Sequence, residues 1–336
     1  MARYVVAGLG AVGARAARQV HSLGDVEALW LVGSDRARAQ EIAGAIGTPA
    51  RPGTWDEALA DSPDAVVFCG AVGQLVGADR LVERASAALD AGANVISTAD
   101  GLEEIDGLLA LDARARDRSR SVVAGAAFCP GLSCVLAVHA AARMEEVTEV
   151  RVAGSGSGGP ACRRTYRRSL SGLAHEWESG SWIPHPAGSG RELCWFPDPE
   201  GGRDCYRADF AANQLLAPAF PSAQRISARR ARSPRERLGL DRPVRHRRSE
   251  GSSGAIRVEV VGRQAGAVVS RVLGAYDRPA VAAGAVAALA AHWAVDGRLA
   301  RSGAGGLAEL VKDSVGFLGE LAERGVKAAV FTGYGG

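Results

Sequence analysis

The stretch Gly8-Leu9-Gly10-Ala11-Val12-Gly13 follows an apolar run at residues 3–8 and opens a helical pattern that continues to about residue 23. A G-x-G-x-x-G sequence between a strand and a helix is typical of a dinucleotide-binding turn. Gly8 permits the tight turn, Gly10 lets the backbone approach a pyrophosphate, and Gly13 lets the helix pack closely on the strand. The pyrophosphate would meet free N–H groups at the positive end of the helix dipole. The alternative is an ordinary glycine-rich turn.

Apolar strands and amphipathic helices alternate on short loops through the first 125 residues. We expect strands over 3–8, 28–32, 64–68, 94–97 and 121–124, and helices over 11–23, 35–46, 55–60, 78–91 and 106–118. This alternation favours βαβ units and a parallel sheet. The sequence therefore predicts an α/β fold in which residues 1–125 form a doubly wound Rossmann domain.

The pattern changes after residue 125. We expect a helix over 132–144, strands near 147–154, 193–197, 224–231, 255–262 and 266–274, a helix over 279–300, a glycine-rich turn at 303–306 and a last helix over 307–323. The last two strands read as an antiparallel hairpin. These elements predict an α+β domain with a mixed or antiparallel sheet over 126–276, for substrate binding or dimerisation. The C-terminal helices over 277–336 could pack back on the Rossmann domain.

The end of the second strand decides which dinucleotide fits. An acidic residue there binds the ribose 2′-hydroxyl of NAD, whereas donors and positive charge suit the 2′-phosphate of NADP. If the strand ends at Val32, the acid position holds Gly33, and Ser34 and Arg36 could bind the phosphate. A register two residues later puts Asp35 on the hydroxyl. We favour NADP, with NAD as the alternative. Arg36 could also be plain surface charge.

The loop after the strand over 64–68 is Cys69-Gly70, and loops at the carboxyl ends of parallel strands face the ligand crevice. The thiol of Cys69 could take part in chemistry, although cysteine is more often a small buried hydrophobic residue. The candidate cofactor-binding residues are Gly8, Gly10, Ala11, Val12, Gly13, Ser34, Asp35, Arg36, Cys69 and Gly70.

Composition narrows the class of protein. The 336 residues suffice for two domains, and a formal charge of +3 does not by itself imply a nucleic-acid or membrane partner. Six scattered cysteines without a C-x-x-C pair give no signal for a metal site. The chain shows no secretory signal pattern and no window of roughly 18 apolar residues. We expect a cytoplasmic protein with reduced thiols and no membrane span.

Residues 225–248 carry ten arginines, interrupted by two prolines. Such a run could bind an anionic partner such as nucleic acid or a phosphorylated substrate. No aromatic residue is interleaved to stack on bases, which argues against nucleic acid. We expect a solvated loop between two strands and no nucleic-acid partner.

Several residues of the second half could contact a small-molecule substrate. Arg163 and the backbone at the start of a helix near residue 160 could bind a carboxylate. Tyr166 and, two turns later, His175 could exchange a proton. These residues could instead be exposed helix positions and a surface pair of His175 with Glu176. The aromatic residues of 177–206 could wall a pocket or fill a small core.

Cys129 lies at the expected domain junction, where its thiol would act as a nucleophile only if the thiolate were stabilised, and would otherwise be inert packing. We assign no catalytic acid or base and no metal. The candidate substrate residues are Cys129, Pro130, Gly131, Arg163, Tyr166 and His175.

The glycine motif at 8–13, the Cys69-Gly70 loop, residues 93–98 and residues 126–133 resemble the saccharopine dehydrogenase and carboxynorspermidine dehydrogenase group. The resemblance covers the first 135 residues, and Phe128-Cys129 stands where such enzymes often carry a glycine or polar residue and an acid. The resemblance implies an NAD(P)-dependent oxidoreductase that transfers hydride to or from an amino acid or its carbonyl or imine counterpart. A non-catalytic NADP(H) sensor is the alternative. A homodimer through the second domain's sheet is suggested by analogy.

Overall fold

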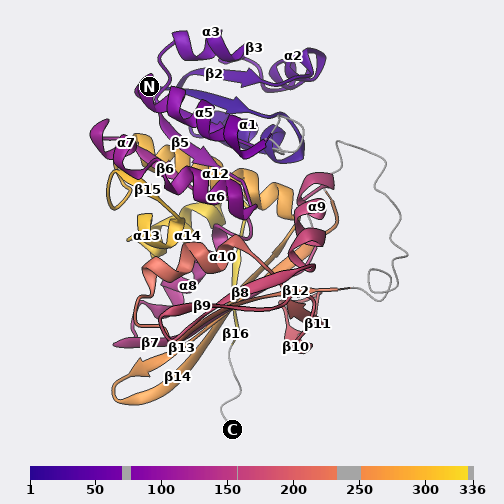
Figure 1. Ribbon diagram of the computed structural model, residues 1–336. Helices are drawn as coiled ribbons and strands as arrows, with labels where there is room; N and C mark the ends of the chain where they lie inside the picture. The colour runs from indigo at the N-terminus through magenta and orange to yellow at the C-terminus, as the bar shows by residue number, and fades with distance from the viewer. Residues whose placement is uncertain (70–76, 157, 233–250, 332–336) are drawn as a thin grey trace. The chain divides into compact units, whose positions relative to one another are not determined.

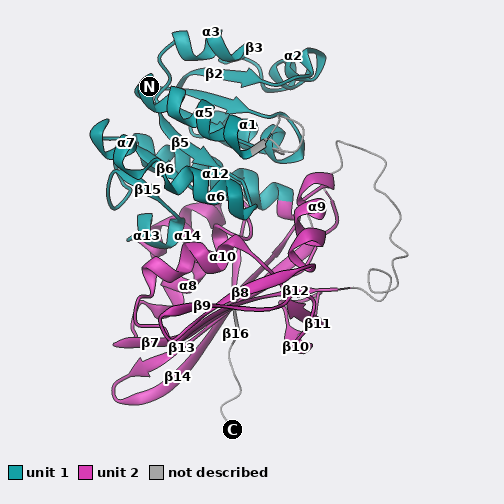
Figure 2. Ribbon diagram, viewed as in Figure 1, with its two compact units in different colours: residues 1–127, 280–312 teal, residues 128–279, 313–336 magenta. Residues whose placement is uncertain are grey.

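The computed structural model describes residues 1–69, 77–156, 158–232 and 251–331 (Figure 1). The chain forms two compact units. Unit 1 comprises residues 1–127 and 280–312, and unit 2 comprises residues 128–279 and 313–336 (Figure 2). Each unit has its own β-sheet. The segment after residue 279 is thus divided between the units.

Unit 1 contains a seven-stranded parallel sheet in the order β15-β6-β5-β4-β1-β2-β3. Its strands are β1 (Ala2–Ala7), β2 (Val26–Val32), β3 (Ala50–Gly53), β4 (Ala65–Phe68), β5 (Asn94–Ser97), β6 (Ser121–Val123) and β15 (Gly303–Gly305). The central strands are continuous apolar runs because helices cover both faces of the sheet (Figure 1). The strand order reverses between β1 and β4, as in a doubly wound Rossmann domain, so the predicted fold class is confirmed.

The helices of unit 1 are α1 (Ala11–His21), α2 (Arg36–Ile46), α3 (Trp55–Ala60), α5 (Gly77–Asp90), α6 (Leu102–Leu109), α7 (Asp112–Asp117), α12 (Pro279–Val295) and α13 (Leu307–Leu310). Helix α12 is rich in alanine and buried on nearly all sides, as expected of a helix that is apolar around its whole circumference. A Cβ on its Gly284 would lie 2.7 Å from Cβ of Arg15 on α1, so this glycine permits the close packing of the two helices.

Several elements differ from the sequence prediction. The expected last helix over 307–323 is two helices, α13 in unit 1 and α14 (Ser314–Glu323) in unit 2. The expected helix over 106–118 is two helices, α6 and α7. Strand β3 was not predicted, because four residues that include Pro52 and Gly53 carry no apolar alternation. The expected turn at 303–306 is the edge strand β15, which pairs with β6. The carboxylate of Asp112 fixes this strand by accepting a 2.8 Å hydrogen bond from Ala304 N, a long-range contact that local sequence does not reveal.

Unit 2 contains a nine-stranded mixed sheet in the order β10-β11-β12-β7-β13-β14-β16, with β8 pairing to β12 and to β9. Its elements are β7 (Glu146–Gly154), β8 (Leu173–Glu178), β9 (Ser181–Pro186), β10 (Glu192–Trp195), β11 (Gly202–Arg207), β12 (Arg225–Ala231), β13 (Gly254–Gln264), β14 (Ala267–Asp277), β16 (Ala328–Phe331), α8 (Leu132–Ala141), α9 (Pro160–Ser169), α10 (Ala211–Leu216), a 3₁₀ turn (Ala217–Ala219) and α14 (Ser314–Glu323). Strands β7 and β12 are parallel, and β13 and β14 form the predicted antiparallel hairpin. A second α+β domain with a mixed sheet is therefore confirmed.

The arginine run begins in the strand that was predicted near 224–231, so the expectation of a solvated loop over 225–248 is wrong for residues 225–231. These residues form β12 in the interior of the sheet, and Arg229 and Arg230 are buried. The carboxylate of Glu176 on β8 accepts hydrogen bonds from Arg207, Arg225 and Arg229. The buried acid neutralises positive charge that the sequence alone places in solvent. The rest of the run, from residue 233, lies outside the described residues.

Within the described ranges, no helix has both the length and the apolar composition needed to cross a membrane.

Candidate dinucleotide site

The loops that follow β1, β2 and β4 begin side by side at the carboxyl-terminal edge of the unit 1 sheet. Gly8 N donates to Val32 O at 2.8 Å, and Cys69 N donates to Ala7 O at 2.8 Å, so the strand pairing extends one residue into these loops. The edge lies where the strand order reverses. Open parallel sheets bind their ligands outside the carboxyl ends of the strands at such a point.

Two of the three motif glycines are required by the protein's own geometry. Gly8 has φ 96°, a left-handed conformation that favours glycine. A Cβ on Gly13 would lie 1.8 Å from Gly8 O and 3.2 Å from Cβ of Cys69, so any side chain there would push α1 off the sheet. Gly8 and Gly13 therefore set how closely α1 approaches β1 and β4.

The glycine at position 10 is not required by backbone conformation or by packing. Its φ of −72° is open to any residue, and among the residues that the structure describes a Cβ built on it would meet no atom within 4 Å. Gly10 is exposed at the N-cap of α1. Neither strain nor packing accounts for a glycine at this position, whereas the close approach of a ligand to the backbone does.

The first turn of α1 presents backbone donors to the same space. The opening N–H groups of a helix have no acceptor within the helix. Gly10 supplies no capping side chain, and the first turn, which includes Ala11 and Val12, contains no acidic residue. The resulting positive end of an 11-residue helix suits an anion such as a pyrophosphate.

The segment after β2 bears on whether the site prefers NADP or NAD. Strand β2 ends at Val32, which leaves Gly33 in the position of the acid. The carboxylate of Asp35 accepts a 3.0 Å hydrogen bond from Arg38 N and thereby caps α2. Ser34 and Arg36 flank this cap, and both are exposed. The structure thus gives Asp35 a role in the helix and leaves the hydroxyl of Ser34 and the guanidinium of Arg36 exposed just after the carboxyl end of β2.

Cys69 sits under the glycine motif as a packing residue. Its side chain is buried, and burial raises the pKa of its thiol to about 12, despite an opposing hydrogen bond from Thr98. The thiol is therefore protonated at neutral pH and a poor nucleophile. Gly70, the remaining candidate of this loop, lies outside the described residues.

The substrate candidates near residue 130 lie in the turn that opens α8 in unit 2. Cys129, Pro130 and Gly131 are all buried. Gly131 is the N-cap of α8 with φ 113°, and the hydroxyl of Ser133 donates to Cys129 Sγ at 3.7 Å. The turn at Cys129–Gly131 is therefore a buried turn, in which the Cys129 thiol accepts a hydrogen bond from Ser133.

Tyr166 and His175 do not share a helix, contrary to the sequence prediction. Helix α9, which carries Arg163 and Tyr166, ends at Ser169, and His175 lies on β8. Tyr166 is buried, with the guanidinium carbon of Arg230 3.8 Å from its ring centroid. The Nδ1 atom of His175 lies 3.2 Å from a carboxylate oxygen of Asp209, so its acidic partner is Asp209 rather than Glu176.

The aromatic residues of 177–206 do not line a single pocket. Trp177 and Trp182 meet edge to face with ring centroids 5.2 Å apart on the β8–β9 hairpin. Trp195 is 62% exposed, whereas Phe196 is buried in a small apolar core. Some of these aromatic residues therefore fill a small core, as one of the two predicted alternatives proposed, and others are exposed.

Glu176, Glu178 and His185 bring three potential metal-ligand atoms within 4.8 Å of one another. Glu176 already accepts from three guanidinium groups, and their positive charge opposes a cation at this point. The cluster therefore fits an ion-pair network better than a metal centre.

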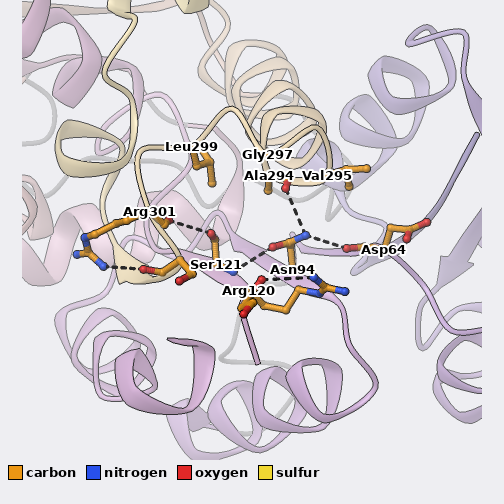
Figure 3. Close-up of a pocket in the computed structure, with 11 residues that line it drawn as sticks. Asp64, Asn94, Arg120, Ser121, Ala294, Val295, Gly297, Leu299 and Arg301 are labelled. Atoms are coloured by element: carbon orange, nitrogen blue, oxygen red, sulfur yellow. Dashed lines mark hydrogen bonds between the residues drawn. The ribbon is translucent and has the colours of Figure 1, made fainter. Parts of the chain in front are cut away.

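A polar cavity of about 300 Å³ lies at the opposite edge of the unit 1 sheet (Figure 3). It is lined by residues at the amino ends of β4, β5 and β6, among them Asp64, Asn94 and Ser121. The side-chain amide of Asn94 is fully engaged there, donating to Asp64 O and Ala294 O and accepting from Ser121 N. This cavity lies away from the carboxyl-terminal edge of the sheet, where the glycine motif stands.

Solved structures share this fold. Apo saccharopine dehydrogenase (L-Glu forming) from Saccharomyces cerevisiae aligns with TM-score 0.68 at 13% identity, over 99% of this chain and 100% of that chain. A probable dehydrogenase from Thermotoga maritima aligns with TM-score 0.51 at 11% identity, over 98% of both chains. Amine dehydrogenase from Mycobacterium smegmatis aligns with TM-score 0.51 at 12% identity, over 93% of this chain and 96% of that chain.

Neither a protein-family model nor a curated protein sequence matches this sequence. At such low identities the structural likeness defines the fold: a Rossmann unit and a mixed-sheet unit of the kind found in the yeast saccharopine dehydrogenase.

Proposed function

We propose that this protein is an NAD(P)-dependent oxidoreductase that binds its dinucleotide across the carboxyl ends of β1, β2 and β4. The observation that carries the proposal is Gly10, whose missing side chain serves neither backbone strain nor packing. A pyrophosphate over Gly10 would contact the opening N–H groups of α1, and Gly8 and Gly13 hold that helix end in place.

NADP is the nucleotide that the β2 loop favours. Ser34 and Arg36 are exposed where the ribose of a bound dinucleotide would lie, and the acid position holds Gly33. A guanidinium binds phosphate oxygens through charge-assisted hydrogen bonds. Asp35, the residue that could favour NAD, already caps α2 through the N–H of Arg38.

The proposed reaction moves hydride between the nicotinamide and a carbon that bears nitrogen or oxygen. When bound, the nicotinamide supplies the hydride chemistry, and the protein binds, orients and excludes water. Support for an amino-acid, imine or carbonyl substrate comes from two neighbours in fold, which are named as an L-Glu-forming saccharopine dehydrogenase and an amine dehydrogenase. Arg163 and the turn at Cys129–Gly131 remain the proposed substrate contacts.

A non-catalytic NADP(H)-binding sensor is the second candidate. It is favoured by the state of the groups that could move a proton: Tyr166 is buried beneath Arg230, and His175 pairs with Asp209. Cys69 is held in its protonated form.

Titration with NADPH and NADH, followed through nicotinamide fluorescence, tests the binding step. We expect saturable binding with a preference for NADPH. Binding of neither nucleotide would contradict the proposal. Incubation of the loaded protein with keto acids plus amines then separates the two candidates, because a substrate-dependent loss of nicotinamide absorbance supports the oxidoreductase. Tight binding without turnover across such a set favours the sensor.

A further inference from the structure

Two cysteines of unit 2 lie on the same face of neighbouring strands. Cys194 lies on β10 and Cys205 on β11, and the antiparallel register places Cys194 opposite Arg203 and Cys205 opposite Glu192. The two cysteines are therefore diagonal neighbours on one face of the strand pair. Both are buried and carry free thiols, and a hydrogen bond joins the two thiols.

Apolar neighbours hold the pair in place. The small core around the two thiols consists of Ala153, Cys194, Phe196, Cys205, Ala231 and Ala255. Packing in such a core restricts the rotamers of both cysteines, so their sulfur atoms stay near each other. The strand order places β10 at the edge of the sheet. Local opening of this edge strand would give a small reagent access to Cys194.

The two thiols differ in acidity. The hydrogen bond from Cys205 lowers the pKa of Cys194, and the charges of Arg257 and Arg229 act in the same direction against burial. The same hydrogen bond, together with burial, raises the pKa of Cys205. By contrast, burial raises the pKa of Cys134 on α8 to about 11. Because the thiolate is the nucleophile, Cys194 is the more reactive of these buried cysteines.

We propose that Cys194 and Cys205 form a dithiol that hydrogen peroxide oxidises to a disulfide. The thiolate of Cys194 attacks one peroxide oxygen, the O–O bond breaks, and Cys194 becomes a sulfenic acid, while the other oxygen leaves as hydroxide and takes up the proton that the Cys194 thiol released, giving water. The sulfur of Cys205 then attacks the sulfenic sulfur, the S–O bond breaks, and a second water leaves with the proton of Cys205. Two thiols and one peroxide thus give one disulfide and two waters.

The cross-link would fasten the edge strand β10 to β11. Disulfides in reducing compartments are mostly transient and redox-sensing, and a pair that starts as adjacent thiols can cycle in this way. The dithiol lies in unit 2, so its oxidation does not depend on a dinucleotide in unit 1.

Peroxide treatment of the full-length protein, followed by alkylation of the remaining thiols under denaturing conditions and tryptic mass spectrometry, tests the proposal. Cleavage after Arg191, Arg203 and Arg207 releases the two cysteines on separate peptides, residues 192–203 and 204–207. We expect these peptides to appear joined, and to separate after treatment with a thiol reductant. Recovery of both as alkylated thiols, or as sulfinic or sulfonic acids without cross-linking, would overturn the proposal.

Three variants test which of the two cysteines reacts first with peroxide and whether the cross-link is specific to this pair. In Cys205→Ser the resolving thiol is absent, so we expect a sulfenic acid at Cys194 that dimedone traps. In Cys194→Ser we expect Cys205 to stay unmodified. The matched control Cys134→Ala removes a buried thiol elsewhere and should leave the cross-link intact. If a serine variant fails to fold, the unsubstituted protein still decides the question through its joined peptides.

Discussion

The carbonyl oxygen of Gly8 lies 1.8 Å from the point that a Cβ on Gly13 would occupy. Two residues of one motif are therefore held together by close packing, whereas no described residue occupies the space where a side chain on Gly10, between them, would stand. Gly8 and Gly13 are therefore needed for packing within the protein, whereas Gly10 is explained by the approach of a ligand. Substitutions at Gly13 and Gly10 should have different consequences.

Gly13→Ala should destabilise unit 1. The added methyl group collides with a backbone atom that cannot move without separating α1 from β1, and overpacking of this kind costs about 1–3 kcal/mol in the free energy of unfolding. Urea denaturation measures the loss. Gly10→Ala serves as the comparison and should leave the free energy of unfolding nearly unchanged. Equal losses in the two variants would contradict the division of the motif.

Arg36→Ala should weaken NADPH binding and spare NADH. Loss of a charge-assisted contact to the 2′-phosphate corresponds to a rise of about tenfold or more in the Kd for NADPH. The control is Arg38→Ala, which removes a guanidinium that pairs with Glu41 within α2. Fluorescence titration with both nucleotides checks the prediction. A parallel weakening of NADH would show that Arg36 does not read the phosphate.

Asp35→Ala should lower stability without lowering NADH affinity. Its carboxylate caps α2, and loss of an N-cap costs about 1 kcal/mol. Thermal denaturation would report the lower Tm. If NADH affinity fell sharply instead, the ribose contact would belong to Asp35 and the nucleotide preference would be NAD.

Glu176→Gln should destabilise unit 2 and flatten its response to acid. Burial opposes ionisation of this carboxyl, but hydrogen bonds and charges from Arg229 and Arg225 outweigh it and lower the pKa of Glu176. A lowered folded-state pKa contributes stability that is present at neutral pH and disappears as the pH falls through that value. Loss of the buried partner costs about 3 kcal/mol at neutral pH. Stability measured from neutral to acidic pH should decline less steeply in the variant.

The β1–α1–β2 unit could be predicted from sequence because its signals are local. The apolar runs, the glycine motif and the helix period all lie within one stretch of about 30 residues. The candidate residues Gly8, Gly10 and Gly13 follow from the same stretch. The conformation of each glycine, and the absence of any described residue close to a Cβ on Gly10, required the structure.

What the sequence could not show depends on distant partners. The strand near 224–231 was predicted, but its arginines were expected in solvent, because their counter-charge, Glu176, lies 53 residues from Arg229. Strand β15 looked like a turn because its glycines pair with β6, far away in the chain. The cap formed by Asp35 is a local feature, and an Asp three residues before the N–H of Arg38 at a helix start is a signal that could have separated it from a ribose ligand.

The most direct test of the central claim compares Gly10→Leu with Gly44→Leu by NADPH titration. A Cβ on either glycine would meet no atom of the described ranges within 4 Å, and Gly44 lies on the exposed side of α2. Both variants should fold. We predict that Gly10→Leu abolishes NADPH binding and that Gly44→Leu binds as the unsubstituted protein does. Undiminished binding by a folded Gly10→Leu variant would contradict a dinucleotide site on α1.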